Sequence, residues 1–278
     1  GGLGIIHRYN TIEEQVALVR DACMEGRCPV GVAVGISGDY LDRATALYDA
    51  GARILCVDVA HGHHIFMNFA LKKLREIFGD TVHLMAGNVA TFEGFDALCS
   101  WGADSIRVGI GGGSICSTRT VSGHGMPTFQ SILECSKSQY DVSIIADGGL
   151  KTSGDIVKAL AAGADFVMIG SLLAGTDETP GEILMGRRGK KYKVYRGMAS
   201  RAAQESWRGK SSAPEGVSTT IPYKGPVENI LRDLTGGIKS GFSYSGSSHL
   251  AELQVKAKFI RQTSAGQYES STHIMRRQ

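Results

Sequence analysis

The chain repeats one arrangement along most of its length: a short apolar run, a stretch with helical periodicity, and another apolar run. The runs are rich in β-branched residues and continuous rather than alternating, which is typical of strands buried on both faces. Strands that alternate with helices in this way predict a parallel sheet with crossover helices. The predicted strands are Gly4–His7, Val30–Ile36, Ile54–Val59, His83–Val89, Ser105–Ile110, Val142–Ala146 and Phe166–Ile169.

The predicted helices between these strands carry signals at both ends. Thr91 and Ser153 are candidate N-caps, because their hydroxyls can accept hydrogen bonds from first-turn N–H groups. Three helices are followed by a Gly-Ala pair, and Gly51, Gly102 and Gly163 stand where a left-handed C-terminal cap belongs. The predicted helices are Thr11–Cys23, Asp39–Asp49, His64–Ile77, Thr91–Ser100, Thr128–Ser138 and Ser153–Ala161.

Polar and glycine-rich segments gather after the predicted strands rather than before them. A (β/α)8 barrel builds its site from loops at the carboxyl ends of its strands, so this pattern favours that fold. A doubly wound sheet is the alternative, but its G-x-G-x-x-G turn does not open this chain. Because we count seven strands and not eight, we expect a single barrel over residues 1–278 from which a first βα unit is missing. The segments are Asp58–Gly62, Gly87–Asn88, Gly109–Arg119, Asp147–Gly149 and Gly170–Ser171.

After the last predicted strand the pattern changes. Residues 176–218 are polar and turn-rich, and we expect a hairpin followed by a mobile lid. The basic run Arg187–Lys191 is interpreted as the solvated tip of that hairpin, because the stacking aromatics of a nucleic-acid site are lacking. A C-terminal part, 226–278, is expected to hold a closing helix at Val227–Lys239 and a tail from Thr263 that is extended or poorly ordered on its own.

Composition excludes several classes of protein. The 30 Lys and Arg and 27 Asp and Glu leave a net charge of +3, too small to indicate a nucleic-acid partner. No apolar stretch reaches the roughly 18 residues of a membrane-spanning helix, so no membrane partner is expected. Six cysteines, most of them in apolar runs, favour a reducing compartment. We therefore expect a cytoplasmic protein, with a peroxisome-like organelle left open.

Glycine is unusually frequent, with 37 of 278 residues, and the densest cluster is Gly109–Arg119. Clustered glycines let backbone N–H groups approach an anion closely, and Ser114 adds a hydroxyl donor. Cys116 lies in this loop near Arg119, a setting that can favour a reactive thiolate. By contrast, the buried cysteine of an apolar run is usually a small hydrophobic residue, which is our interpretation of Cys56, Cys99 and Cys135.

Two further strand ends carry polar groups. Asp147 is placed where a carboxylate can accept both hydroxyls of a ribose, although it could also be only a turn residue. Gly170-Ser171 ends the next strand, and loops after the last two strands of a barrel recurrently bind phosphate. Together with Ser114 these segments favour a nucleoside monophosphate as ligand.

Asp58 and the histidines His61, His63 and His64 follow a buried strand. A metal site is one interpretation of the three histidines. The sequence, however, offers neither a carboxylate-rich partner cluster for these histidines nor an H-E-x-x-H motif. Asp58 at the strand end is more simply explained by contact with a polar ligand.

Six short motifs occur along the chain in a characteristic order. They are Gly-Gly-Leu-Gly-Ile-Ile-His, Ala-Gly-Asn-Val, Arg-Val-Gly-Ile-Gly-Gly-Gly-Ser-Ile-Cys, Ala-Asp-Gly-Gly, Met-Ile-Gly-Ser and Tyr-Arg-Gly-Met-Ala-Ser. In this order they resemble the IMP dehydrogenase/GMP reductase family, from Gly1 to about Tyr268. The resemblance implies a (β/α)8 barrel, as a homotetramer or larger, that acts on a purine nucleoside monophosphate with a nicotinamide cofactor.

The resemblance also implies roles for individual residues. Cys116 would attack purine C2 and form a covalent thioimidate. Asp147 would bind the ribose, and Gly197 and Met198 would contact the base. The groups implied for the phosphate are Ser114, Gly149, Gly170, Ser171 and Tyr195. Those implied for the cofactor side are Asp58, Asn88, Arg107 and Arg8. A monovalent cation, potassium, would bind the carbonyls of Gly111, Gly113 and Cys116, completed by the segment with Glu269 from a neighbouring subunit.

The family resembled contains two activities. One oxidises IMP to XMP with NAD and hydrolyses the adduct with an Arg-Tyr pair on a mobile flap. The other expels ammonia from GMP and then reduces the adduct with NADPH. The stretch between Met198 and Glu215 holds no Arg-Tyr pair, and the loop after Cys116 is similar to the reductase pattern, so we expect the second activity.

The reductase activity also implies a task for Thr118 and Glu215. A hydroxyl bridged to a carboxylate can relay a proton to the leaving amine. The dehydrogenase remains the alternative within the family, and a barrel that only senses purine phosphate remains the alternative outside it. Members of the family insert a pair of CBS regulatory modules near residues 23–28, where this sequence runs straight through.

Overall fold

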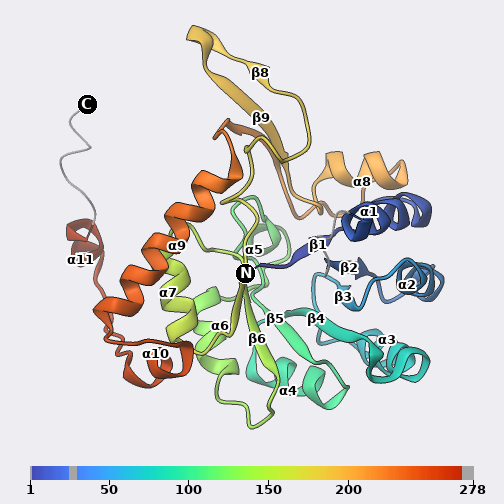
Figure 1. Ribbon diagram of the computed structural model, residues 1–278, viewed down its shortest axis with the longest axis horizontal. Helices are drawn as coiled ribbons and strands as arrows, with labels where there is room; N and C mark the ends of the chain where they lie inside the picture. Colours follow the sequence, from blue (N-terminus) through green and yellow to red (C-terminus); the bar gives the residue numbers. More distant parts are fainter. Residues whose placement is uncertain (1, 25–29, 271–278) are drawn as a thin grey trace.

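A computed structural model describes residues 2–24 and 30–270 of the protein. Most of the expected module junction at 23–28 therefore lies outside the described residues. Figure 1 shows a curled sheet near the centre, helices around it, and a hairpin that projects away from both.

Seven strands form one parallel sheet in the same order as in the chain. This arrangement is a partial (β/α)8 barrel, as predicted, because neighbours in sequence are neighbours in the sheet. The strand order never reverses, which excludes the doubly wound alternative. The strands are β1 (Gly4–Ile6), β2 (Val30–Val34), β3 (Ile54–Asp58), β4 (His83–Val89), β5 (Ser105–Val108), β6 (Ser143–Asp147) and β7 (Phe166–Met168).

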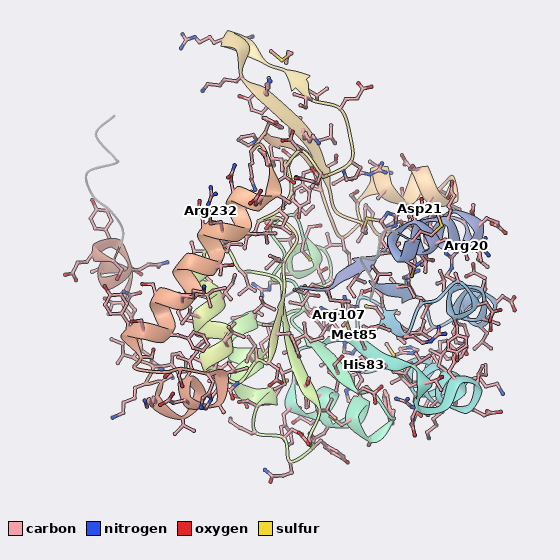
Figure 2. The ribbon with its side chains drawn as sticks, in the orientation of Figure 1. Arg20, Asp21, His83, Met85, Arg107 and Arg232 are labelled. Atoms are coloured by element: carbon pink, nitrogen blue, oxygen red, sulfur yellow. The ribbon has the colours of Figure 1, made fainter. Side chains whose placement is uncertain are left out.

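Helices cover the outer face of the curled sheet, and the main core lies between the two layers (Figure 1). Successive side chains of β5 point to opposite faces of the sheet. Ile106 packs in the core under the helices, whereas Arg107 lies on the inner face of the curled sheet. Figure 2 shows Arg107 close to Met85 of β4, which belongs to a smaller inner cluster. The covering helices are α1 (Ile12–Met24), α2 (Tyr40–Asp49), α3 (Ile65–Phe78, followed by the short turn η1, Gly79–Thr81), α4 (Phe92–Ser100), α6 (Thr128–Cys135) and α7 (Ser153–Ala161).

The helix ends agree with the predicted signals, with one exception. Thr91 caps α4 by accepting a hydrogen bond from Gly94 N, and Gly51, Gly102 and Gly163 have positive φ just after their helices. The prediction that Ser153 caps α7 is wrong. Thr152 is the N-cap, and it forms a capping box in which its hydroxyl accepts from Asp155 N at 3.1 Å.

We expect Thr152→Ala to lower the free energy of unfolding by about 1 kcal/mol, because it removes the cap of α7. Ser153→Ala is the matched comparison, and it should change that free energy by less than about 0.5 kcal/mol. Urea denaturation followed by circular dichroism measures both values. A larger loss in Ser153→Ala than in Thr152→Ala would contradict the assignment of the cap.

A second, three-stranded antiparallel sheet follows β7. It consists of β8 (Leu184–Met185), β9 (Lys191–Arg196) and β10 (Ser218–Pro222), with β9 in the middle. The turn η2 (Arg187–Gly189) joins β8 to β9 at the far end of the projecting hairpin, so the basic run lies at its tip (Figure 1). Between β9 and β10, the segment expected to be a lid contains helix α8 (Arg201–Arg208).

The C-terminal part is helical. Helix α9 (Val227–Tyr244) packs against α7, and is longer than the predicted closing helix. Helix α10 (Leu250–Lys256) follows, and then α11 (Ser264–Glu269). The prediction of an extended tail is wrong for residues 264–269, because the Thr263 hydroxyl accepts a hydrogen bond from Gly266 N and caps this helix. Within the described ranges, the helices include none with the length and apolar character needed to span a bilayer.

Candidate functional site

Two loops at the carboxyl ends of β5 and β6 lie in direct contact. A β-carbon on Gly109 would come within 2.0 Å of the Asp147 carbonyl oxygen, and one on Gly112 within 2.4 Å of the Thr128 hydroxyl. Gly109 also has φ +143°, where a side chain is strained. Glycine is therefore required for this contact, which brings the loop of Ser114 against the loop of Gly149.

Cys116 is exposed at the end of the first loop, before the short helix α5 (Thr118–Val121). Its Sγ donates a hydrogen bond to the Thr118 hydroxyl at 3.1 Å. The backbone of a distant segment lies alongside, because Ser117 N donates to Glu215 O at 2.8 Å. The structure thus brings all three predicted catalytic residues together. Within the described residues, no hydrogen bond joins the Glu215 carboxylate to the Thr118 hydroxyl.

The segment after β9 completes the surroundings of Cys116. Gly197 N donates to Val217 O at 3.0 Å, and Val217 N donates to Ile115 O at 3.0 Å. A β-carbon on Gly197 would lie 3.4 Å from the Ile115 side chain, which leaves little space between the two segments. Met198, one residue later, is partly exposed. Gly197 therefore lies against the loop of Cys116, and Met198 follows it; their contact with the base stays a prediction.

The predicted phosphate groups lie at the ends of β6 and β7. Asp147 pairs with Met168 in the sheet, so Gly149 and Gly170 each follow that pair by two residues. The Tyr195 hydroxyl lies 3.9 Å from the place of a β-carbon on Gly170. Among the described residues, the backbone N–H groups of Gly149, Gly170 and Ser171 have no acceptor. Such N–H groups on glycine-rich loops can bind an oxyanion.

A network of charged side chains occupies the inner face of the sheet. The Arg107 guanidinium donates to Asp58 Oδ1 and, at 3.4 Å, to Asp147 Oδ2. Asn88 Nδ2 donates to the same Asp147 oxygen at 2.8 Å and to Gly109 O at 2.8 Å. Burial raises the pKa of the Asp147 carboxyl, while Arg107 and Asn88 act in the opposite direction. Asp147 Oδ1 has no partner among the described residues, so it can accept a hydroxyl.

Arg8 connects this network to helix α8. Its Nε lies 3.8 Å from Asp58 Oδ2, and its guanidinium lies over the rings of Tyr9 and Trp207 at 5.3 and 5.7 Å from their centroids. A cavity of about 260 Å³ opens beside these groups. It is lined by Arg8, Gly35, Ile36, Ser37, Gly38, Asp39, Arg43, Val59 and Trp207.

Two parts of this cavity, Gly35–Asp39 and Trp207, were not predicted from the sequence. Gly35–Asp39 follows β2, so the rule that polar and glycine-rich segments after strands form the site could have found it. Nothing in the sequence pairs Trp207 with Tyr9, whose ring centroids lie 4.5 Å apart.

The histidines after β3 have local partners. His64 caps α3, and its Nδ1 accepts a hydrogen bond from Phe66 N at 3.1 Å. The rings of His61 and His63 lie 6.4 Å apart, and burial, together with the neighbouring histidines, lowers the pKa of His61. Over residues 2–24 and 30–270, no three His, Cys, Asp or Glu side chains form a group that could hold a metal ion.

Glu269 is the one predicted site residue that this chain does not bring near the others. It ends helix α11, which lies outside α9 in Figure 1, well apart from α5 and the loop of Cys116. A single chain therefore does not place Glu269 beside Gly111 and Gly113. Its contribution to a neighbouring subunit remains a prediction.

Comparison with known proteins agrees with this geometry. The family model described as "IMP dehydrogenase / GMP reductase domain" matches residues 1–273. An inosine-5′-monophosphate dehydrogenase from Nitrosopumilus maritimus is 44% identical over 263 residues, which are 90% of this chain and 55% of that protein. A GMP reductase from Leishmania major is 45% identical over 261 residues, 89% of this chain and 53% of that protein.

A solved structure is also similar. It is a variant of GMP reductase from Trypanosoma brucei in complex with guanosine 5′-monophosphate, with a TM-score of 0.84 and 46% sequence identity. The alignment covers 89% of this chain and 53% of that one. The chain thus spans about half the length of the relatives that it matches.

Proposed function

Because the chain belongs to the IMP dehydrogenase/GMP reductase family of oxidoreductases, we propose that it converts GMP to IMP and ammonia with NADPH. The observation that carries the proposal is the arrangement at Cys116. Its Sγ contacts the Thr118 hydroxyl, and the Glu215 backbone lies against the next residue. A dehydrogenase needs an Arg-Tyr pair to activate water, and the segment 198–215 holds none.

In the first step, the Cys116 sulfur forms a bond to purine C2 and the bond from C2 to the exocyclic nitrogen breaks. The amine leaves as ammonia, since the thiol proton is transferred to it. Thr118 is placed to pass that proton, because its hydroxyl lies 3.1 Å from the sulfur. Glu215 holds the other end of the relay once its carboxylate turns toward Thr118.

In the second step, C2 accepts a hydride, the C2–S bond breaks, and the thiolate takes a proton from solvent. The nicotinamide cofactor, when bound, supplies that hydride. The residues present fit such a group: the Asp58 carboxylate is 33% exposed, and Arg8 lies between it and the cavity of about 260 Å³. Asp58, Asn88 and Arg8 would hold the cofactor, and Arg107 would fix the orientation of Asp58.

The proposal extends to the assembly and to a cation. We include a homotetramer or larger assembly in the cytoplasm, with potassium at the carbonyls of Gly111, Gly113 and Cys116. The carbonyls of Gly111 and Cys116 accept no hydrogen bond from described residues, which leaves them free to ligate a cation. The Gly113 carbonyl accepts Cys116 N at 3.1 Å, and its second lone pair remains.

Turnover with each substrate pair tests the activity. We expect GMP and NADPH to give loss of NADPH absorbance with release of ammonia. Formation of NADH from IMP and NAD would instead favour the dehydrogenase, which relatives of similar identity also support. Binding of GMP without turnover of either pair would favour a nucleotide sensor.

Glu215→Gln is expected to slow ammonia release from GMP by about 100- to 10,000-fold, because the proton relay loses its carboxylate. The affinity for GMP should stay within about threefold, since the substitution keeps size and polarity. Glu205→Gln on α8 is the control, because Glu205 is an exposed carboxylate on the same segment. Rapid-quench measurement of ammonia checks the step. An equal, small effect of both substitutions would contradict the relay.

A further inference from the structure

A buried lysine lies behind the loop that follows β7. Lys193 is on the middle strand β9 and is only 4% exposed. Its Nζ donates to three backbone carbonyls, those of Thr176 at 2.9 Å, Asp177 at 3.3 Å and Thr179 at 2.6 Å. Each of these carbonyls belongs to the loop 170–179, so one ammonium group binds the second half of that loop.

A second lysine binds the first half of the same loop. Lys224, just after β10, donates from Nζ to Ser171 O at 3.0 Å and to Leu172 O at 2.9 Å. Its backbone N also donates to Gly175 O at 2.9 Å. We call Lys193 and Lys224 the lysine pair. Together they bind five carbonyl oxygens on one side of loop 170–179.

The orientation of the carbonyls determines where the N–H groups point. In a trans peptide the C=O and the N–H of one unit point in opposite directions. Because Ser171 O is directed at Lys224, the N–H of Leu172 is directed to the other side of the loop. Among the described residues, the N–H groups of Gly170, Ser171 and Leu172 have no acceptor. The lysine contacts thus direct one free N–H, that of Leu172, to the side of the loop away from them, which we call the N–H side. The Gly170 carbonyl is instead bound within the loop, by Leu173 N and Ala174 N at 3.0 Å each.

The lysine pair also changes the electrostatics of the N–H side. Carbonyl oxygens without partners would present negative partial charge close to an incoming anion. Two ammonium groups at these oxygens replace it with positive charge, and the burial of Lys193 keeps solvent from screening it. Period two along β9 places Tyr195 on the same face as Lys193, with its hydroxyl near Gly170. Lys193 thus fixes the strand that carries Tyr195 as well as the loop.

We propose that Lys193 and Lys224 are positioning residues for the substrate phosphate, acting through loop 170–179 without touching the phosphate. The inference rests on the proposed function only in that the substrate is a purine nucleoside monophosphate. It holds for GMP and for IMP alike, so it does not depend on which of the two reactions the protein catalyses.

The test compares a nucleotide with its nucleoside. Calorimetric titration of the full chain should show that Lys193→Met binds GMP about tenfold more weakly, the effect of one charge removed at short range. Guanosine, which has no phosphate, should bind both proteins within about twofold of each other. Lys224→Met should give the same selective loss at a smaller size, since its ammonium group is nearer solvent. IMP and inosine provide the same comparison.

Lys190→Met is the matched control, because it removes one positive charge from an exposed position on the same hairpin. It should leave both affinities unchanged. Equal weakening of GMP and guanosine would overturn the proposal, since a lysine that only stabilises the fold affects both ligands. Wild-type affinity for GMP in Lys193→Met or in Lys224→Met would overturn it too. If Lys193→Met does not fold, the affinities of Lys224→Met for GMP and for guanosine decide whether the proposal holds.

A wild-type chain that binds neither GMP nor IMP contradicts the proposed function itself, and the role of the lysine pair with it. That result appears before any variant is compared, so the two failures are distinguishable.

Discussion

Cys116→Ala is expected to abolish turnover of GMP with NADPH and of IMP with NAD, by at least about 10,000-fold, because the proposed covalent adduct cannot form in either reaction. The affinity for GMP should fall by less than about fivefold, since the groups proposed to hold phosphate, ribose and base are unchanged. Stopped-flow absorbance measures the rate, and calorimetric titration measures the affinity. The combination of lost rate and kept affinity identifies a nucleophile rather than a binding group.

Cys99→Ala is the control for this substitution. Cys99 is a buried residue of α4 in the core between sheet and helices, and burial raises the pKa of its thiol to about 12. It should keep its activity, and iodoacetamide should inactivate the wild type and this control at equal rates. Turnover that persists in Cys116→Ala would refute the covalent role.

Arg107→Met is expected to lower the free energy of unfolding by about 3–5 kcal/mol at neutral pH, because it leaves two carboxylates without their buried cation. Arg107 is 7% exposed on its side chain and contacts both Asp58 and Asp147. Urea denaturation gives the value. Arg20→Met removes an exposed guanidinium from α1, on the outside of the molecule in Figure 2, and should change stability by less than about 0.5 kcal/mol.

The loss in Arg107→Met should also depend on pH. Burial holds the pKa of Asp147 above its ordinary value, so the folded state binds its proton more tightly than the unfolded state. Stability therefore falls as pH rises from the ordinary pKa through the folded one. Without Arg107 the pKa of the Asp147 carboxyl in the folded state rises further. The pH range over which stability falls therefore extends to higher pH.

The deficit relative to wild type should thus be larger in a mildly alkaline buffer than in a mildly acidic one, where Asp147 takes up its proton. Adding Asp147→Asn to Arg107→Met should recover part of it, because the amide carries no charge to bury. A deficit that is the same at both pH values would contradict the account of the charge network.

The order of strands and helices could be predicted because local patterns carry it. Each predicted strand is present with ends within two residues of the expected ones, since short continuous apolar runs are typical of strands covered on both faces. The strand ends then predicted the site, because parallel strands bring their carboxyl ends to one edge. That rule predicts Asp58, Asn88, Asp147 and Gly170 as site residues, and all four lie at or just after the carboxyl ends of strands.

Other features were not predicted from the sequence. Both Thr152 and Ser153 can cap a helix, and Asp155 decides between them, because its carboxylate accepts a hydrogen bond from Thr152 N at 3.1 Å and closes a capping box. Thr263 could be recognised as a candidate N-cap in the same way as Thr91. The polar composition of the tail, however, gave no sign of the six-residue helix that it caps. Lys193 could not be singled out, because its partners are carbonyls and carbonyls have no sequence signature.

Helix α8 belongs to a segment, residues 200–216, whose two ends are hydrogen-bonded to each other. Ser200 and Gly216 form a β-bridge, and Glu215 N donates to Ala199 O at 3.0 Å. The chain between these points leaves the loop of Cys116 and returns to it, so the length of this segment does not determine the geometry at Cys116. Closing a loop twice as long costs only about 0.6 kcal/mol more. Insertions and deletions between residues 200 and 216 therefore cost little stability and need not disturb the geometry at Cys116.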